Sequence, residues 1–247
     1  MTSKIAVVTG GVGGIGQAVV KRLAESGFLV CIIDQNEVAG HELVKILGRQ
    51  NRIGEFYRVD LRRSAEIKSI FEHIYAKSQR VDVLVNLAGG TLHKHSITDF
   101  PLSEWREVID VNLKATFLCC QEVARIMKEA KRGAIINTSS NFGITGSAGR
   151  TAYSAAKTAI IAFSKSLALE MAPYGIRVNT IAPGLTATER VMAAHTEAEW
   201  ANLSKSMPLG RAGQPADIAE GVNFLATDES AFMTGQVLHV NGGMIFN

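Results

Sequence analysis

The sequence predicts a single-domain α/β fold in which a doubly wound parallel sheet of about seven strands carries helices on both faces. Short apolar runs alternate with longer amphipathic stretches along the whole chain, which is the pattern of repeated βαβ units with right-handed crossovers. The short runs are almost entirely apolar, as expected of parallel strands that are covered on both faces. The 247 residues include only five prolines and no linker-like stretch, so we expect one domain over residues 1–247.

The expected strands are the short runs rich in Val and Ile, and the expected helices are the amphipathic stretches between them. The strands span Ile5 to Val8, Leu29 to Ile33, Phe56 to Val59, Val81 to Val85, Ala134 to Asn137, Arg177 to Ile181 and Val237 to Val240. The helices span Ile15 to Ala24, Val38 to Leu47, Ser64 to Ala76, Ser103 to Lys128, Tyr153 to Met171 and Pro215 to Leu225.

Charge and cysteine content exclude several classes of protein. The formal net charge is +3 and no run of five basic residues occurs, so we expect neither a nucleic-acid partner nor an acidic membrane surface. The start of the chain lacks the features of a signal peptide and no run has the length of a membrane span, which favours a cytoplasmic protein. Cys31, Cys119 and Cys120 form no CxxC motif, and we expect reduced, buried thiols.

A glycine-rich stretch, TGGVGGIG at Thr9 to Gly16, directly follows the first expected strand and opens the first expected helix. In this context Gly10, Gly14 and Gly16 allow a tight turn, a close approach of ligand phosphate and close helix packing, and the helix N-terminus faces the anion. A glycine-rich turn alone is a weak signal, but Asp34 ends the second strand 18 residues after Gly16. A carboxylate there accepts the adenosine ribose hydroxyls and repels a 2′-phosphate. With no Arg or Lys in the glycine loop or directly after Asp34, the sequence predicts NAD rather than NADP.

Tyr153 and Lys157 stand four residues apart in the stretch TAYSAAKTA. On a helix they share one face, and a cation beside a phenol lowers its pKa from the usual value near 10. Tyr153 could then exchange a proton with an alcohol, although the pair alone is equally compatible with a solvated helix face. Ser139 and Ser140 follow the end of an expected strand, which is the side where ligands bind in open α/β sheets. Ser140 can hydrogen-bond a substrate oxygen there.

Taken together, these motifs resemble the short-chain dehydrogenase/reductase family in its short, NAD(P)-dependent, Rossmann-like type, over essentially the whole chain. The resemblance rests on TGGVGGIG at Thr9 to Gly16, Asp60 with Leu61, NLAGG at Asn86 to Gly90, Asn112 in DVNLKATF, Ser140, YSAAK at Tyr153 to Lys157, and NTIAPG at Asn179 to Gly184. One departure is Leu87, because the family commonly has a second asparagine there, and this puts a local sheet or loop contact in doubt.

The resemblance implies a catalytic set of four residues. Ser140 would polarise and position the carbonyl, Tyr153 would act as the acid or base, Lys157 would lower the tyrosine pKa and hold the nicotinamide ribose, and Asn112 would anchor a water relay. The implied NAD-binding residues also include groups near the adenine (Asp60, Leu61), the adenosine ribose (Asn86, Ala88) and the carboxamide (Thr186, Thr188). The full expected cofactor set is Gly10, Val12, Gly14, Ile15, Gly16, Asp34, Asp60, Leu61, Asn86, Ala88, Gly89, Tyr153, Lys157, Pro183, Gly184, Thr186 and Thr188. A homotetramer with pairwise two-fold interfaces is also implied.

The expected activity is reversible hydride transfer between NAD and a small-molecule secondary alcohol or ketone, without a metal. One alternative within the family is a 3-oxoacyl carrier-protein reductase, which usually goes with NADP and a basic patch. Asp34 opposes the first requirement, and Tyr174 stands where such reductases often carry Arg, which leaves Lys131 and Arg132 as a candidate patch. A non-catalytic NAD-binding regulator is an alternative of another class, and it would be expected to lose part of the catalytic set.

The segment from Leu185 to Met207, with Met192 and Trp200, is the expected substrate lid. The loops with His93 to His95 and Asn141 to Arg150 are the other expected walls, in which Phe142 and Ile144 could bury an apolar group. At the mouth, His93, Lys94, His95 or Arg150 could meet a carboxylate or phosphate, or could merely solvate the rim. The spacing of His93 and His95 could suit a metal, but no third ligand is evident in the sequence, so no metal site is predicted.

Overall fold

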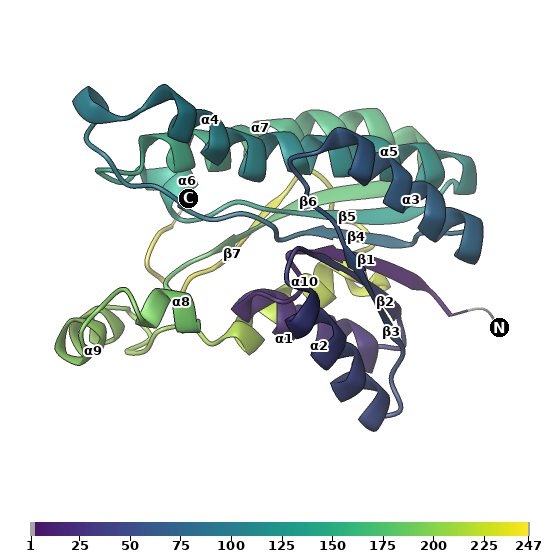
Figure 1. Ribbon diagram of the computed structural model, residues 1–247, viewed down its shortest axis with the longest axis horizontal. Helices are drawn as coiled ribbons and strands as arrows, with labels where there is room; N and C mark the ends of the chain where they lie inside the picture. The colour runs from purple at the N-terminus through teal and green to yellow at the C-terminus, as the bar shows by residue number, and fades with distance from the viewer. Residues whose placement is uncertain (1–2, 247) are drawn as a thin grey trace.

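The computed structural model describes residues 3 to 246 and contains a seven-stranded, all-parallel sheet (Figure 1). The strand order is β3-β2-β1-β4-β5-β6-β7, as expected for a Rossmann-like, doubly wound fold. The strands are β1 (Ile5–Thr9), β2 (Leu29–Asp34), β3 (Gly54–Arg58), β4 (Val83–Asn86), β5 (Gly133–Thr138), β6 (Ile176–Pro183) and β7 (Val237–Val240). The order reverses between β1 and β4, so a crevice for a ligand opens at the carboxyl ends of these two strands.

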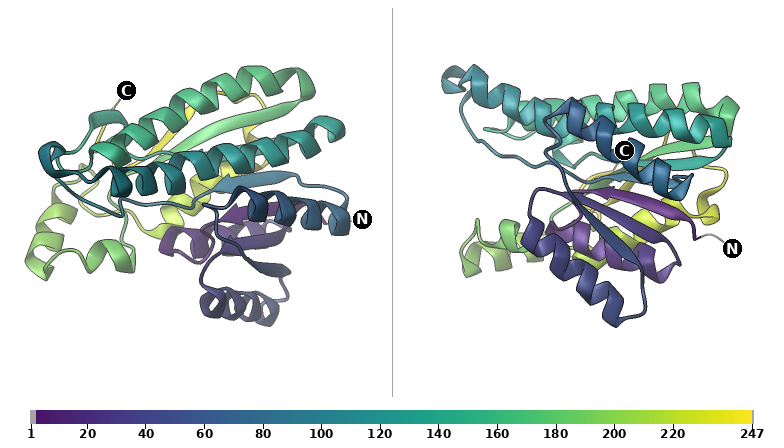
Figure 2. Two further views of the ribbon diagram at one scale, coloured as in Figure 1. Left: turned by 45° about the horizontal axis from the view of Figure 1, so that its top comes forward. Right: turned by 45° about the vertical axis from the view of Figure 1, so that its right-hand side comes forward.

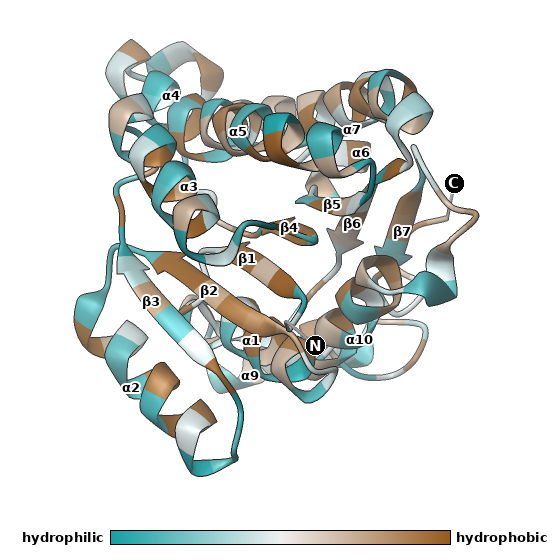
Figure 3. Ribbon diagram, turned by 90° about the vertical axis from the view of Figure 1, so that its right-hand side faces the viewer, coloured by the Kyte–Doolittle hydropathy of each residue, from teal (hydrophilic) through white to brown (hydrophobic). Residues whose placement is uncertain are grey.

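Helices cover both faces of the sheet, and Figure 3 shows the two layers edge-on. One layer holds α1, α2 and α10, and the other holds α3, α5 and α7. The helices are α1 (Gly14–Glu25), α2 (Glu37–Arg49), α3 (Ser64–Ser78), α4 (Leu102–Ile109), α5 (Ala115–Ala130), α6 (Phe142–Thr145), α7 (Thr151–Met171), α8 (Glu189–Met192), α9 (Glu197–Lys205) and α10 (Pro215–Ala226). Shorter helical turns are η1 (Ile97–Asp99), η2 (Asp110–Lys114), η3 (Ala172–Tyr174) and η4 (Asp228–Ser230).

The core consists of two apolar layers, one on each face of the sheet. In β1, Ile5 and Val7 face one layer while Ala6 and Val8 face the other, because successive side chains of a strand point to opposite faces. All four are at least 96% buried, which explains why the strand sequences are continuously apolar. Cys31, Cys119 and Cys120 are buried in the apolar layer that Ile5 and Val7 face, and they form no disulfide. Burial raises the pKa of Cys31 and Cys120 to about 12.

The expected single helix from Ser103 to Lys128 was wrong in one respect, because α4 and α5 are separated by a π-helical turn, η2. Asn112 lies at the centre of this turn and is fully buried. Its Nδ2 donates to the Val108 carbonyl at 2.9 Å, and Thr116 Oγ1 donates to the Asn112 carbonyl at 2.7 Å. Side chains therefore bond to the backbone where the regular helix is interrupted, which is a known cause of local distortion. Such π-turns are frequent at functional sites.

Helices α8 and α9 lie apart from the two layers, at the end of the molecule remote from the N-terminus (Figure 1). Their caps are built into the sequence, since Thr188 caps α8 and Thr196 forms a capping box with Glu199 on α9. Two of the longer helices, α5 and α7, run side by side over one face of the sheet (Figure 2). In the part of the chain from residue 3 to 246, no helix is long and apolar enough to cross a membrane.

Candidate active site

The glycine turn between β1 and α1 is built so tightly that side chains are excluded from it. Gly10 adopts φ +67°, and a Cβ atom there would lie 2.7 Å from the backbone nitrogen of Ala88. A Cβ at Gly16 would overlap the Gly10 carbonyl oxygen, and one at Gly14 would lie 2.8 Å from Cβ of Thr188. Gly10 and Gly16 thus serve the turn and the helix packing, whereas Gly14 lies directly under the start of the lid segment.

This turn fits a nucleotide cofactor. The N-terminus of α1 has no side-chain cap and no acidic residue in its first turn, so its free N–H groups can bind an anion. The Asp34 carboxylate at the end of β2 accepts the backbone N–H groups of Gln35 at 2.8 Å, Asn36 at 3.2 Å and Val12 at 3.3 Å. These bonds orient a half-buried carboxylate beside the turn, where it can accept ribose hydroxyls. Val12 and Ile15 pack against the core and support the turn from below.

Asp60 and Leu61 lie beyond Asp34, next to the carboxyl end of β3. Asp60 accepts hydrogen bonds from Gln35 Nε2 at 2.9 Å and from the Arg62 guanidinium at 2.9 to 3.2 Å, and the bonds to Arg62 lower the pKa of Asp60 to about 2. The Leu61 side chain is 8% exposed and belongs to the core. Contact of Leu61 with a bound adenine is therefore restricted mainly to its backbone.

The Asn86 side chain points into the protein and away from the crevice. It is 3% exposed, and its Nδ2 donates to Asn137 Oδ1 at 2.9 Å. Thr9 supports the same loop, since its hydroxyl accepts the Ala88 N–H at 3.3 Å. The Asn86 side chain thus fixes the loop from below, and a contact of this loop with the adenosine ribose stays a prediction. Leu87 packs against the apolar layer on the α1 face.

Ser140 and Tyr153, the expected reactive pair, lie next to each other, and their side chains are hydrogen-bonded. The Ser140 Oγ accepts the backbone N–H of Phe142 at 3.2 Å, which directs the hydroxyl toward Tyr153. The neighbouring Ser139 is 2% exposed and donates to the Lys157 carbonyl at 2.7 Å. The geometry therefore leaves Ser140, and not Ser139, available to a substrate.

Burial raises the pKa of the Tyr153 phenol, while the Ser140 hydrogen bond and the charges of Arg190 and Arg150 lower it. The net shift is upward, so the expectation that a neighbouring cation brings this pKa below its usual value is wrong for the protein without its cofactor. The reason is that Lys157 Nζ lies 5.6 Å from the centre of the phenol ring and desolvation outweighs the nearby charges.

Lys157 is one of the most strongly perturbed groups of the molecule. Its side chain is 3% exposed, and Nζ donates to the Thr138 carbonyl at 2.8 Å. Burial, together with the charge of Arg190, lowers the pKa of Lys157 from 10.5 to about 7. A lysine with this pKa can gain or lose its proton near neutral pH, which is the property expected of a group in a proton path.

Asn112, in the π-turn, is bonded to the loop Gly89–Gly90, which passes beside Lys157. Asn112 Oδ1 accepts the Gly90 N–H and Nδ2 donates to the Gly90 carbonyl, both at 3.0 Å. A Cβ at Gly89 would overlap Asn112 Oδ1 and lie 3.6 Å from Lys157 Nζ. Asn112 is thus a positioning residue whose amide clamps the loop beside Lys157.

The lid segment begins at the end of β6 and closes onto the glycine turn. The Gly184 N–H donates to Val240 O at 3.0 Å, directly after Pro183 ends the strand. Thr186 is buried, donates to the Gly184 carbonyl at 3.1 Å and pairs with Gly213. Thr188 lies over Gly14 and caps α8 through the Val191 N–H.

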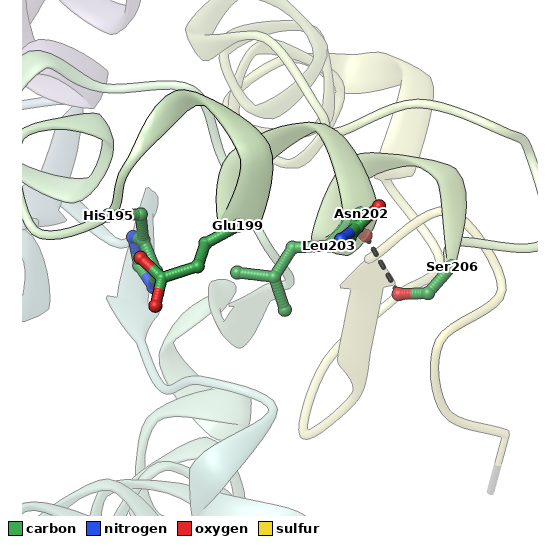
Figure 4. A pocket seen from close by; sticks show the side chains of 5 residues that line it. All are labelled: His195, Glu199, Asn202, Leu203 and Ser206. Atoms are coloured by element: carbon green, nitrogen blue, oxygen red, sulfur yellow. Dashed lines mark hydrogen bonds between the residues drawn. The ribbon is translucent and has the colours of Figure 1, made fainter.

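A hollow of about 460 Å³ lies along the lid. Figure 4 shows His195, Glu199 and Leu203, which are spaced one helical turn apart, projecting from the same side of the chain. Asn202 and Ser206 complete the lining. Trp200 lies behind His195, with ring centres 6.1 Å apart, and so supports the lid rather than lining this hollow.

The loop with His93 and His95 contains a group of residues that the sequence did not reveal. His93 Nδ1 lies 2.9 Å from Glu104, its Nε2 lies 2.9 Å from Glu107, and His95 Nε2 lies 2.7 Å from Glu104. A third residue with metal-ligand chemistry, Glu104, is therefore present, contrary to the expectation from the sequence. The His93–Glu107 and His95–Glu104 contacts are direct hydrogen bonds between the side chains. Both histidines are thus paired with acidic groups and do not offer a free positive charge to a substrate.

Lys131 and Arg132 lie at the other edge of the sheet from Ser140 and Tyr153. They form the turn that enters β5, at the amino edge of the sheet, whereas Tyr153 and Ser140 lie beyond its carboxyl edge. Arg132 lies 3.9 Å from Asp82 at the same amino edge. The candidate basic patch therefore does not line the site of its own chain.

Arg190 belongs to the site but was missed from the sequence. Its guanidinium covers Gly90, since a Cβ there would lie 2.7 Å from Nη1 of Arg190. Its charge lowers the pKa of both Tyr153 and Lys157. The only signal in the sequence is its place two residues after Thr188, in a short segment with no other basic residue before Lys205.

Comparisons with known proteins agree with this geometry over nearly the whole chain. The family model described as Enoyl-(Acyl carrier protein) reductase matches residues 10–245. The chain is 40% identical to 3-oxoacyl-[acyl-carrier-protein] reductase FabG of Chlamydia pneumoniae over 248 residues, which are 100% of this chain and 98% of the relative. It is 36% identical to cyclopentanol dehydrogenase of Comamonas sp. (strain NCIMB 9872) over 250 residues, with 100% and 99% covered. The crystal structure of gox2181 superposes with a TM-score of 0.94 at 32% identity, covering 98% of this chain and 96% of that one.

Proposed function

The chain belongs to the short-chain dehydrogenase/reductase family, and on this premise we propose that it interconverts a secondary alcohol and a ketone by hydride transfer with NAD. The observation that carries the proposal is the convergence of Ser140, Tyr153 and Lys157 at the crevice beside the glycine turn. Bound NAD would supply the hydride chemistry. The residues of the chain orient the substrate and handle the proton.

In the direction of alcohol oxidation, the Tyr153 phenol passes its own proton on to the amine form of Lys157. The phenolate then accepts the proton of the substrate hydroxyl as hydride leaves the carbon that bears this hydroxyl. In the direction of ketone reduction, the phenol returns this proton to the carbonyl oxygen. The Ser140 hydroxyl donates a hydrogen bond to the same oxygen and polarises it. A positioned acid or base of this kind typically contributes 10²- to 10⁴-fold to the rate.

Lys157 holds the proton at Nζ behind the tyrosine. Because its pKa is about 7, the ammonium and amine forms are both populated near neutral pH. The Thr138 carbonyl fixes Nζ, and the Asn112 amide fixes the loop that passes it. This arrangement lets Lys157 exchange a proton as the charge on Tyr153 changes.

The preference for NAD over NADP is supported by Asp34. Its carboxylate is held beside the glycine turn by three backbone N–H groups, and neither Gln35 nor Asn36 offers a positive charge. Arg58 pairs with Asp34 in the strand register, but its guanidinium lies 3.9 Å from Glu37. A 2′-phosphate would therefore meet a negative charge that no adjacent free cation offsets.

A second candidate is reduction of a 3-oxoacyl group on carrier protein, which the names of the FabG relatives favour. Placement of Lys131 and Arg132 at the opposite edge of the sheet removes them as a docking patch within one chain. A panel of secondary alcohols, hydroxy acids and 3-hydroxyacyl thioesters, each with NAD and NADP, separates the two candidates. Highest kcat/KM on an acyl thioester with NADPH would favour the second one.

The proposal extends to the assembly and to the lid. Exposed apolar side chains lie on α5 (Phe117, 42% exposed) and α7 (Leu169, 79%), and others lie near the C-terminus (Phe232, Phe246). We propose that they are covered in a homotetramer.

Residues 185 to 207 act as the substrate lid, and the buried, unpaired thiols fit a reducing, cytoplasmic compartment.

The decisive test of the proposed function is turnover by the purified protein. Oxidation of at least one secondary alcohol with NAD, lost when Tyr153 is changed to Phe, is the expected result. Absence of turnover for all alcohols and ketones of the panel, in both directions and with both cofactors, would contradict the proposed function.

A further inference from the structure

Two arginines flank the reactive tyrosine without an acidic partner. In the described residues 3 to 246, neither the Arg190 nor the Arg150 guanidinium forms an ion pair, and the Arg190 guanidinium forms no hydrogen bond. Many other arginines of the chain are paired with carboxylates, for example Arg22 with Glu220 at 2.8 Å. A guanidinium is a rigid fork that matches carboxylate and phosphate groups, so an unpaired one beside a reactive centre is poised for an anion.

Arg190 is an exposed residue whose guanidinium lies against Gly90. Its Nη1, Nη2 and Cζ atoms would all lie within 2.7 to 3.2 Å of a Cβ at Gly90. The flat guanidinium therefore occupies space that a side chain at position 90 would fill. Gly90 itself is clamped by Asn112, so the position of the charge is tied to the catalytic loop.

Arg150 lies at the start of α7, the helix that carries Tyr153. Its Nη1 donates to Ser147 Oγ at 2.8 Å, and its guanidinium carbon lies 4.9 Å from the centre of the Phe142 ring. Both contacts orient the guanidinium, and neither neutralises its charge. The charges of Arg190 and Arg150 both lower the pKa of the Tyr153 phenol, which agrees with the place of Arg150 three residues before Tyr153 and of Arg190 on Gly90.

Two acidic residues of α4 that face the loop before Arg150 already have histidine partners. Glu104 and Glu107 bind His93 and His95, and the His95 N–H donates to the Gly149 carbonyl next to Arg150 at 3.1 Å. These pairings keep the carboxylates from neutralising the arginines. Glu189 directly precedes Arg190 in the chain, but within residues 3 to 246 it forms no ion pair with Arg190 or Arg150.

We propose that Arg190 and Arg150 form an anion subsite beside Tyr153, so that the substrate of this enzyme is an alcohol or ketone carrying a carboxylate or phosphate group. This inference rests on the proposed hydride-transfer function. Arg190 lies on the lid, so binding of the anion also draws the lid onto the substrate. A neutral alcohol lacks this contact and binds without it.

The test compares each anionic ketone with a neutral ketone that has the same reacting carbonyl group. Acetoacetate is paired with its ethyl ester, 4-oxopentanoate with its ethyl ester, and dihydroxyacetone phosphate with dihydroxyacetone, each with NADH. For the preferred anion the wild type should show a kcat/KM ratio of charged to neutral partner well above one. Arg190→Met should lower this ratio roughly 10- to 100-fold, the effect of losing hydrogen bonds to a charged group, and Arg190→Lys should lower it less. Any effect on the pKa of Tyr153 applies to both partners and cancels in the ratio.

Arg52→Met is the matched control. Arg52 is an exposed arginine in the turn between α2 and β3, at the opposite edge of the sheet, and its removal changes the net charge equally. Arg150→Met should lower the ratio in the same direction as Arg190→Met. Equal ratios in the wild type and in both site variants would overturn the proposal while leaving the proposed function intact.

Calorimetry provides a readout that does not depend on turnover. Acetoacetate, 4-oxopentanoate and dihydroxyacetone phosphate are titrated into protein saturated with NAD, where no hydride is available and a ketone only binds. At least one of them should bind the wild type and the Arg52→Met variant, and should bind at least tenfold more weakly to Arg190→Met. If Arg190→Met instead raises the Kd of NAD tenfold and leaves the Kd values of the three anions unchanged, Arg190 serves the cofactor phosphates and the proposal is wrong. Failure of all three anions to bind the wild type also overturns it.

Discussion

Replacing Lys157 by Met removes a buried ammonium group whose charged form the fold disfavours. Lys157 is 3% exposed, and burial lowers its pKa to about 7. Between pH 7 and 10.5 the unfolded chain binds a proton that the folded chain lacks. The free energy of unfolding therefore rises with pH between pH 7 and 10.5, and this gain is lost as the pH falls toward 7.

The size of the effect follows from the shift. One pH unit corresponds to about 1.4 kcal/mol, and the folded group is half titrated at pH 7, so the wild type gains roughly 2 kcal/mol between pH 7 and pH 9. Methionine has a similar length and does not titrate. Loss of the hydrogen bond to the Thr138 carbonyl costs about 1 kcal/mol at both pH values. We therefore expect the difference in unfolding free energy between wild type and Lys157→Met to change by roughly 2 kcal/mol, in favour of the wild type, from pH 7 to pH 9.

Urea unfolding of both proteins at pH 7 and pH 9, without cofactor, measures this change. Lys165→Met is the control, because Lys165 is an exposed lysine on the same helix, and its unfolding free energy should follow that of the wild type. Parallel pH dependence of the wild type and Lys157→Met would show that Lys157 keeps its proton in the folded protein. The proton path assigned to it would then be wrong.

Further predictions concern the cofactor, the tyrosine, the glycine turn and the assembly. Tyr153→Phe should lower kcat by 10²- to 10⁴-fold with the Kd of NAD retained; a kcat near that of the wild type would exclude Tyr153 as the acid or base. The wild type should use NAD with a much higher kcat/KM than NADP, and Asp34→Ser should narrow this gap, whereas equal efficiency of the wild type with both cofactors would refute the role of Asp34. Gly16→Ala should destabilise the protein by about 1–3 kcal/mol, because its Cβ would overlap the Gly10 carbonyl oxygen, while Gly48→Ala, which meets nothing within 4 Å, should be neutral or stabilising in the same thermal unfolding assay. Light scattering should give the mass of a tetramer, and a monomer mass at micromolar concentration would contradict the proposed assembly.

The strands and most helices could be predicted because their signal is local. Val237–Val240 was predicted to the residue, and the other strands begin and end within two residues of the expected positions. The apolar pattern is sufficient where a strand is buried on both faces. The π-turn at Asp110–Lys114 was missed because the apolar pattern continues through it, and the bonds of the Asn112 amide to Val108 and to Gly90 leave no mark in that pattern.

Motif residues near the reactive centre could be located from spacing, but the direction of their side chains could not. The sequence places Asn86 and Leu61 beside the cofactor but does not reveal that both side chains are buried, Asn86 against Asn137 and Leu61 in the core. Arg190 was missed for the opposite reason: no motif marks it, and only the fold of the lid brings it onto Gly90. The acidic partners of His93 were hidden because they lie on α4, more than ten residues along the chain.

Isotope transfer tests the proposed function most directly. A secondary alcohol carrying deuterium on its carbinol carbon is incubated with the protein and NAD, and the reduced cofactor is analysed by mass spectrometry. The account predicts deuterium in the reduced nicotinamide with the wild type, and a rate lower by at least 10²-fold with Tyr153→Phe. Reduced cofactor without deuterium, or label transfer at the wild-type rate by Tyr153→Phe, would contradict it.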